Sequence, residues 1–144
     1  MITLLQRVSK ASVDVSNETI AQIRQGILVL VGVQSEDDES TARGFVDRLI
    51  NYRVFSDAQG KMNLSLVDIE GGLLLVPQFT LAANTKKGRR PSFTSAASPQ
   101  HGEQIFDVMT DYARNSYGEV ACGSFGADMQ VHLVNDGPVT FILD

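Results

Sequence analysis

The chain has 144 residues, of which 43% are hydrophobic, and this length and apolar content suit one compact domain over residues 1–144 with a full core. Its formal net charge of −5 at pH 7 disfavours a protein that coats nucleic acid non-specifically, because such binding depends on neutralising many phosphates. No stretch resembles a signal segment or a membrane span, so we expect a cytoplasmic protein without a membrane partner.

Four short strands are predicted before any helix. They are the apolar or alternating runs at residues 2–8, 11–15, 18–23 and 26–33. The last run, GILVLVGV, is apolar throughout, so we expect it to be buried on both faces of a sheet. The first helix is predicted within residues 37–55, where acidic residues precede apolar ones at helical spacing: Ala42, Phe45, Val46, Leu49 and Ile50.

After a turn, a strand at residues 71–81 is predicted to return the chain to the core. The second helix is capped by Ser98, starts at Pro99 and ends before Gly118, and its apolar stripe consists of Ile105, Val108, Met109 and Tyr112. Two final strands are expected to flank the segment NDGPV. Runs of strands with two inserted helices predict an α+β fold with a mostly antiparallel, barrel-like sheet and two main helices.

The basic residues are concentrated in one place. Four of the twelve Lys and Arg residues stand within TKKGRRPSF, whose glycine and proline indicate a loop, and they are Lys86, Lys87, Arg89 and Arg90. A basic loop on an acidic body predicts a local contact with phosphate groups. The alternative is a solvated loop whose charges only aid solubility.

Familiar catalytic and metal-binding patterns are absent from the sequence. His101 and His132 are its two histidines, and neither stands in a Cys, His or Asp cluster with metal-site spacing, so we expect no metal. There is no Walker phosphate loop and no G-x-S-x-G motif, and GSFG at 123–126 is too short to indicate an RNA-binding module. Cys122 is expected to be a small residue in or near the core rather than a nucleophile.

The segment VPQFTLAA at residues 76–83 breaks the pattern of an apolar strand. Pro77 removes a ladder hydrogen bond, which confines it to an edge or an end of a strand. Gln78, Phe79 and Thr80 are then expected where backbone N–H groups are free. Such groups can stabilise an oxyanion, and the ring offers a stacking surface. The alternative is an ordinary edge strand with polar residues.

The segment NDGPVT at residues 135–140 contains a proline that a hairpin turn does not need. Asn-Asp-Gly alone would close a hairpin between the flanking strands. A proline beside a glycine instead indicates a backbone held in one particular shape without polar side chains.

Five motifs together resemble those of the D-aminoacyl-tRNA deacylase family, also described as the D-tyrosyl-tRNA deacylase family. They cover the chain in order: QRVSKASV near the N-terminus, PQFTL at 77–81, KKGRRPSF in the basic loop, FGADM at 125–129 and NDGPVT at 135–140. The chain departs from the family pattern at Pro77, where the family usually has serine, which leaves open any role of that hydroxyl. Gln78, Phe79 and Thr80 are unchanged.

The resemblance implies a homodimeric editing enzyme without a cofactor. It would hydrolyse the ester that joins a D-amino acid to the 3′-terminal adenosine of tRNA, and would also remove glycine from mischarged tRNA. The family's Gly-Pro pair corresponds to Gly137 and Pro138, which would form a cis peptide bond and reach into the active site of the other subunit. An enzyme that accepts many D-amino acids must read the arrangement about Cα, and main-chain oxygens held close to Cα would do so.

The family's catalytic segment corresponds to Gln78, Phe79 and Thr80, and two mechanisms are open. Thr80 has the hydroxyl of a nucleophile, but a nucleophilic threonine needs an adjacent base and none is near it in sequence. In the version we favour, water attacks with help from the ribose 2′-hydroxyl, while the N–H groups of Phe79 and Thr80 stabilise the oxyanion.

The resemblance also implies binding residues. Phe125, Gly126 and Met129 would line the adenosine pocket, Arg7 would support the cis pair, and the four cations of the basic loop would bind tRNA. For Phe125 and Met129 the alternative is an ordinary core position.

Two other functional classes remain open at this point. The first is an RNA-binding module without turnover that uses the basic loop and Phe79. The second is a metal or cysteine hydrolase, which the composition disfavours. The expected partners are tRNA and a second copy of the chain, with no DNA and no membrane.

Overall fold

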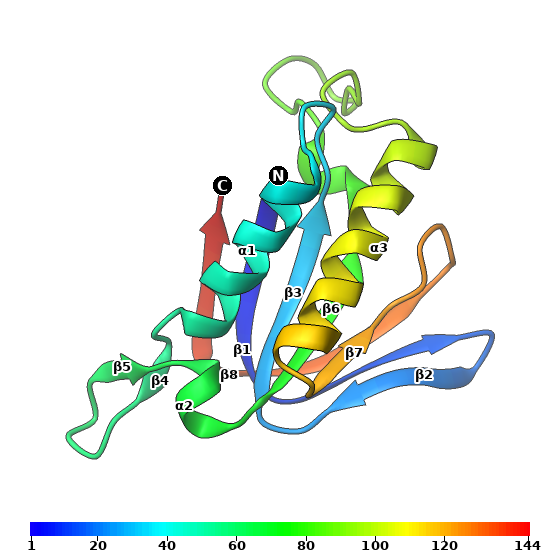
Figure 1. Ribbon diagram of the computed structural model, residues 1–144. Helices are drawn as coiled ribbons and strands as arrows, with labels where there is room; N and C mark the ends of the chain where they lie inside the picture. The colour runs from blue at the N-terminus through cyan, green and yellow to red at the C-terminus, as the bar shows by residue number, and fades with distance from the viewer.

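The computed structural model describes residues 1–144 and shows one mixed sheet with two long helices packed against it (Figure 1). The strands are β1 (Ile2–Val15), β2 (Glu18–Ile23), β3 (Gly26–Gly32), β4 (Phe55–Ser56), β5 (Met62–Leu64), β6 (Gly72–Pro77), β7 (Val120–Cys122) and β8 (Gln130–Leu143). The helices are α1 (Glu39–Asn51), α2 (Leu66–Ile69), the short 3-10 helix η1 (Phe79–Ala82) and α3 (Pro99–Ser116).

The sheet has the strand order β2-β1-β3-β6-β7, with β8 also paired to β1, and β4 and β5 form a separate hairpin. The first half of β1 pairs with β3 and the second half with β2, while β8 follows β1 along both halves. All these pairs are antiparallel, and the sheet curls into the expected barrel-like form. The pairs β3/β6 and β6/β7 are parallel. Parallel neighbours need long crossovers, and α1 and α3 lie within these two connections.

The predicted α+β fold with two main helices is confirmed, α3 begins at the predicted cap Ser98, and a side-chain cap also starts α1. The side chain of Asp38 accepts a hydrogen bond from the N–H of Thr41 at the start of α1. The side chain of Ser98 accepts one from the N–H of His101 at the start of α3, directly before Pro99. These bonds satisfy N–H groups that the first turn of a helix leaves free.

The core lies on both faces of the central strands. In β3, Ile27 and Val29 belong to the larger core beneath α1 and α3, whereas Leu28 belongs to a smaller core on the opposite face. Leu73 and Leu74 of β6 divide in the same way. Because successive side chains of a strand point to opposite faces, an apolar run buried on both sides places β3 in the middle of the sheet, as predicted.

Three of the expected strand boundaries were wrong. The runs at 2–8 and 11–15 form one strand, β1, and the strand expected over residues 71–81 ends at Pro77. The hairpin expected at NDGPV does not exist, because β8 continues through this segment while it remains paired to β1.

None of the helices combines the length and the apolar character needed to cross a lipid bilayer.

Candidate active site

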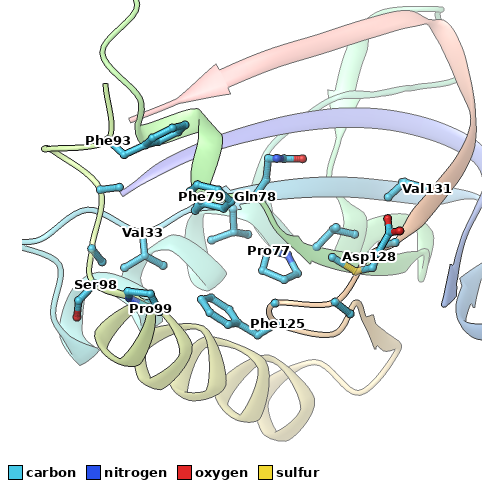
Figure 2. A pocket seen from close by; sticks show the side chains of 18 residues that line it. Val33, Pro77, Gln78, Phe79, Phe93, Ser98, Pro99, Phe125, Asp128 and Val131 are labelled. Atoms are coloured by element: carbon cyan, nitrogen blue, oxygen red, sulfur yellow. The ribbon is translucent and has the colours of Figure 1, made fainter. Parts of the chain in front are cut away.

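A cavity of about 840 Å³ lies where the carboxyl ends of β3 and β6 meet the start of α3 and the segment before β8. Its lining is mainly apolar and contains Pro77 together with five of the predicted site residues, which are Gln78, Phe79, Phe125, Gly126 and Met129. Figure 2 shows Phe93 and Phe79 at one side of this pocket and Asp128 and Val131 at the other. The fold therefore brings together two motifs that are far apart in the sequence.

The end of β6 exposes two backbone donors at this pocket. Pro77 ends the strand because it has no N–H for the ladder. The N–H of Gln78 still donates to the main-chain oxygen of Val31 at 2.7 Å, and the chain then turns into η1. The N–H groups of Phe79 and Thr80 donate no hydrogen bond within the chain. Free donors at the start of a helix suit the binding of negative charge.

The hydroxyl of Thr80 is not arranged as a nucleophile. Its oxygen accepts a hydrogen bond of 2.5 Å from the side-chain amide of Gln78, and an amide is not a base. Thr80 is also not part of the pocket lining. Asp128 is the one ionisable side chain in that lining, and it forms no hydrogen bond or ion pair with Thr80. The lining therefore holds no hydrogen-bonded pair of nucleophile and base.

Phe125 and Met129 form the wall opposite η1. The ring centroids of Phe125 and Phe106 are 6.4 Å apart. Gly102 of α3 leaves room for the Phe125 ring, because a Cβ at this position would lie 3.2 Å from Phe125 Cζ. A Cβ on Gly123 would lie 2.9 Å from the sulfur of Met129 and 3.2 Å from Pro77 Cδ. Both side chains are half-buried, so each lines the pocket and also packs against the edge of the core.

The Gly137-Pro138 segment forms a bulge in β8. Gln6 pairs with Thr140 and Val8 with Asn135, so a single residue of β1 stands opposite residues 136–139 of β8. We call residues 136–139 the bulge. The bond between Gly137 and Pro138 is cis, as the resemblance implied. Gly137 has φ of +134°, a region that favours glycine. Both residues are exposed, and neither lines the pocket of its own chain.

Arg7 supports the bulge from the facing strand. Its Nε donates to the main-chain oxygen of Asp136 at 3.0 Å, and its Nη1 donates to the main-chain oxygen of Val54 at 2.8 Å. The carboxylate of Asp136 lies 3.4 Å from the same Nε, and the Arg7 side chain is only 13% exposed. A planar guanidinium with several fixed donors can hold such a segment in one position. The structure thus places Arg7 beside the cis pair.

The basic loop spans residues 84–92. Asn84 and Ser92 exchange two backbone hydrogen bonds of 2.7 and 3.0 Å that close it. Its four cations are exposed, and none of them forms an ion pair within the chain. Phe93 follows the loop directly and lines the pocket. No role was predicted for Phe93 from the sequence, although an aromatic residue beside a polar, charged loop was a usable signal.

The remaining candidate side chains lie outside the pocket. Cys122 is half-buried against the main core, as expected, and burial raises the pKa of its thiol. The Nε2 of His101 lies 2.8 Å from the main-chain oxygen of Asp37, and that of His132 lies 3.1 Å from the Asp14 carboxylate. No three His, Cys, Asp or Glu side chains gather in a way that suits a metal ion.

Known proteins resemble this chain over its whole length. The family model of D-Tyr-tRNA(Tyr) deacylase matches residues 4–144. A D-aminoacyl-tRNA deacylase of Stutzerimonas stutzeri is 62% identical over 141 residues, covering 98% of this chain and 97% of that protein. One from Pseudomonas aeruginosa is 60% identical over 144 residues, covering 100% and 99%.

A solved structure of a c-Myc DNA Unwinding Element Binding Protein has the same fold. It superposes with a TM-score of 0.95 at 39% identity, covering 100% of this chain and 98% of that one. The match of the family model and the identities over the full chain confirm the resemblance that the five motifs indicated. The chain belongs to the D-Tyr-tRNA(Tyr) deacylase family of hydrolases.

Proposed function

We propose that the protein hydrolyses the ester between a D-amino acid and the 3′-terminal adenosine of tRNA, in line with the names of its relatives. The observation that carries this proposal is the position of the free N–H groups of Phe79 and Thr80 beside an apolar cavity of about 840 Å³. Cavities of this size and character bind small organic groups, here the adenosine with its ester. Two adjacent N–H groups suit the oxyanion of acyl transfer.

Water is the nucleophile in this mechanism, with the ribose 2′-hydroxyl assisting its attack. The water oxygen adds to the ester carbonyl carbon, and the negative carbonyl oxygen accepts hydrogen bonds from the N–H groups of Phe79 and Thr80. The bond to the ribose 3′-oxygen then breaks, and this oxygen takes up the proton that the water loses. The products are free amino acid and tRNA. The contact between Thr80 and Gln78 supports a backbone role for Thr80.

Discrimination against L-amino acids comes from the bulge of a second subunit in this proposal. Main-chain oxygens of Gly137 and Pro138 would bind the α-amino group and leave no room for a side chain in the L position. The support is that the bulge is exposed, held by Arg7, and outside the pocket of its own chain. Glycine has no Cβ to collide, so glycyl-tRNA would also be a substrate.

The second subunit would pack on β8. This strand pairs with β1 alone, and three large apolar side chains on it are exposed: Leu133, Val134 and Ile142. Apolar side chains gathered on a free edge strand are typical of an interface. A two-fold axis there would place the same strand, and the bulge within it, at both sides of the interface.

The basic loop would bind phosphates of the tRNA acceptor end, since its cations are free of partners in the chain. The partner would be RNA, and the enzyme would act in the cytoplasm, where translation takes place. The solved relative is named for binding a DNA element. A DNA oligonucleotide of the acceptor-end sequence therefore belongs among the competitors of any binding assay, and we expect it to compete less well than the RNA.

The test of the proposed function is hydrolysis of three matched esters on one tRNA, with D-Tyr, L-Tyr and Gly. We expect release of D-Tyr and Gly and a stable L-Tyr ester. Comparable hydrolysis of L-Tyr and D-Tyr would contradict the chiral filter. A protein that binds the three tRNAs and leaves every ester lifetime unchanged would be a binding module.

Two reagents separate this mechanism from those of other hydrolases. A chelator and a thiol-alkylating agent should leave the rate unchanged if neither a metal nor Cys122 takes part. The raised thiol pKa of Cys122 already makes it a poor nucleophile near neutral pH. Inhibition by either reagent in a folded protein would require another mechanism.

A further inference from the structure

Two exposed aromatic rings stand together at the mouth of the pocket. Phe79 is 57% exposed and Phe93 is 41% exposed, and their ring centroids are 5.2 Å apart with the planes tilted by 48°. Both belong to the pocket lining, and Figure 2 shows them at the side away from Asp128. Paired rings left in water indicate a contact surface for a ligand or partner.

The position of Phe93 is fixed by its neighbours on both sides. The backbone pair of Asn84 and Ser92 closes the basic loop directly before it. Two residues after it, the hydroxyl of Ser95 donates to the main-chain oxygen of Ala82 in η1 at 2.6 Å. The backbone on both sides of Phe93 is therefore held, between the pocket and the four unpaired cations of the basic loop.

We propose that Phe93, supported by Phe79, stacks on the unpaired nucleobase that precedes the terminal adenosine of the tRNA. This rests on the proposed function, which places that adenosine in the pocket. A single strand that leaves the pocket and brings its phosphates to the basic loop passes the two rings. Aromatic faces combined with cations along the backbone are the usual means of binding single-stranded nucleic acid.

The contact depends on the presence of the base rather than on its identity. Every base offers a π-face, and Phe93 has no polar group that would select one of them. The ring would hold the strand so that the ester, one nucleotide further on, lies at the N–H groups of Phe79 and Thr80. Phe93 is thus a positioning residue for the ester and a binding residue for the penultimate base.

The test uses two short RNAs that end in a D-Tyr ester and differ only at the penultimate nucleotide, which is either cytidine or abasic. For each protein the measured quantity is the ratio of kcat/KM between the two substrates, so that any effect on the pocket itself cancels. Stacking of one base predicts a wild-type ratio of roughly 5-fold to 100-fold in favour of cytidine. Phe93→Leu should bring the ratio close to one, whereas Phe93→Tyr, which keeps the aromatic face, should retain it.

A control variant is Val67→Ala, which truncates an exposed apolar side chain on α2, and it should keep the wild-type ratio. A wild-type ratio near one, or a full ratio in Phe93→Leu, would overturn the stacking contact while the proposed function stands. If the wild type hydrolyses neither substrate nor D-Tyr-tRNA, the proposed function fails as well, and the two failures are thereby distinguished.

Discussion

The pocket and the bulge of β8 differ in how their residues are assembled. The pocket draws on segments that lie far apart in the sequence, and close packing of Pro77 and Met129 around Gly123 joins them. The bulge is one short run of chain, held by Arg7 from the facing strand and by Asn135, whose Oδ1 accepts from the N–H of Val139 at 3.0 Å. The pocket is a recess with an apolar wall, whereas Asp136, Gly137 and Pro138 of the bulge are exposed.

The proposed mechanism requires both regions for a stereospecific ester hydrolysis. In the proposed mechanism the pocket supplies the wall for adenosine and two N–H donors, and Asp128 is its one charged side chain. The bulge offers rigid backbone without a recess. Because the two do not meet within one chain, we attribute their combination to a second copy.

The largest effect is expected from a charge on the exposed face of β8. Ile142 is 68% exposed in the single chain, and Ile142→Asp should prevent dimer formation and reduce D-Tyr-tRNA hydrolysis to the uncatalysed rate. A buried unpaired carboxylate in an interface is strongly unfavourable. Light scattering and the hydrolysis assay measure the two effects together.

The matched control is Val67→Asp, which places the same charge on an exposed apolar residue of α2 and should remain a dimer. An Ile142→Asp protein that is a folded monomer with the wild-type rate would show that each chain acts alone.

A smaller loss is expected when the support of the bulge is removed. Arg7→Ala deletes the hydrogen bonds to Asp136 and Val54, and such bonds to a charged donor are worth about 1.5–3 kcal/mol each. The kcat/KM for D-Tyr-tRNA should fall by roughly ten-fold or more, and Arg7→Lys should not restore it because an ammonium lacks the fixed fork.

Arg48 serves as the comparison, because its Nη1 also donates to a main-chain oxygen. The acceptor is that of Asp144, at a distance of 3.0 Å, and this bond lies outside the bulge. Arg48→Ala should affect kcat/KM less than Arg7→Ala does. Equal losses in the two variants would assign the effect of Arg7 to general stability.

The basic loop should affect binding rather than the chemical step. Replacing its four cations by alanine should raise KM and reduce the slope of log KM against log salt by up to about 0.7 for each phosphate that the loop no longer neutralises. The rate at saturation should change little. The control variant replaces four exposed cations outside the loop by alanine and should leave the slope unchanged. Its replaced residues are Lys10, Arg24, Lys61 and Arg114. An unchanged slope in the loop variant would mean that the charges of the loop only aid solubility.

The smallest effect is expected at Thr80. Thr80→Ala removes the hydroxyl that accepts from the Gln78 amide but keeps the backbone N–H, so most of the deacylase activity should remain. Single-turnover hydrolysis of D-Tyr-tRNA measures this directly. Loss of all activity in a folded dimer would make the hydroxyl essential and the water mechanism wrong.

The sequence predicted best the features that depend on local chemistry. Ser98 and Pro99 act within one turn of a helix, so their roles were readable from a few neighbouring residues. The burial of β3 on both faces followed from its uninterrupted apolar run. Pro77 correctly indicated the end of a strand and the free N–H groups of Phe79 and Thr80, although the N–H of Gln78 still bonds Val31.

Features that depend on distant pairing were missed. Asn-Asp-Gly has the chemistry of a hairpin turn, but pairing with β1 at the other end of the chain keeps β8 continuous and turns the segment into a bulge. The parallel pairing of β3 with β6 likewise depends on contacts that no local pattern shows. Phe93 became a candidate only when the fold placed it beside Phe79.

Mixed dimers of two inactive variants show whether the bulge of one subunit completes the pocket of the other. One variant, Gly137→Val, disrupts the bulge, because its Cβ would lie 2.7 Å from Val139 Cγ2 and 3.1 Å from Arg7 Nη2. The other, Ala127→Trp, places an indole in the pocket. Each variant alone should be inactive on D-Tyr-tRNA.

Co-expression of the two variants should restore activity. A mixed dimer pairs the intact pocket of the Gly137→Val chain with the intact bulge of the Ala127→Trp chain, which gives one complete site. Random pairing makes half of the dimers mixed, so we expect roughly one quarter of the wild-type activity, with L-Tyr-tRNA still rejected. Mixed dimers that stay as inactive as either parent would show that the bulge and the pocket of each active site belong to the same chain.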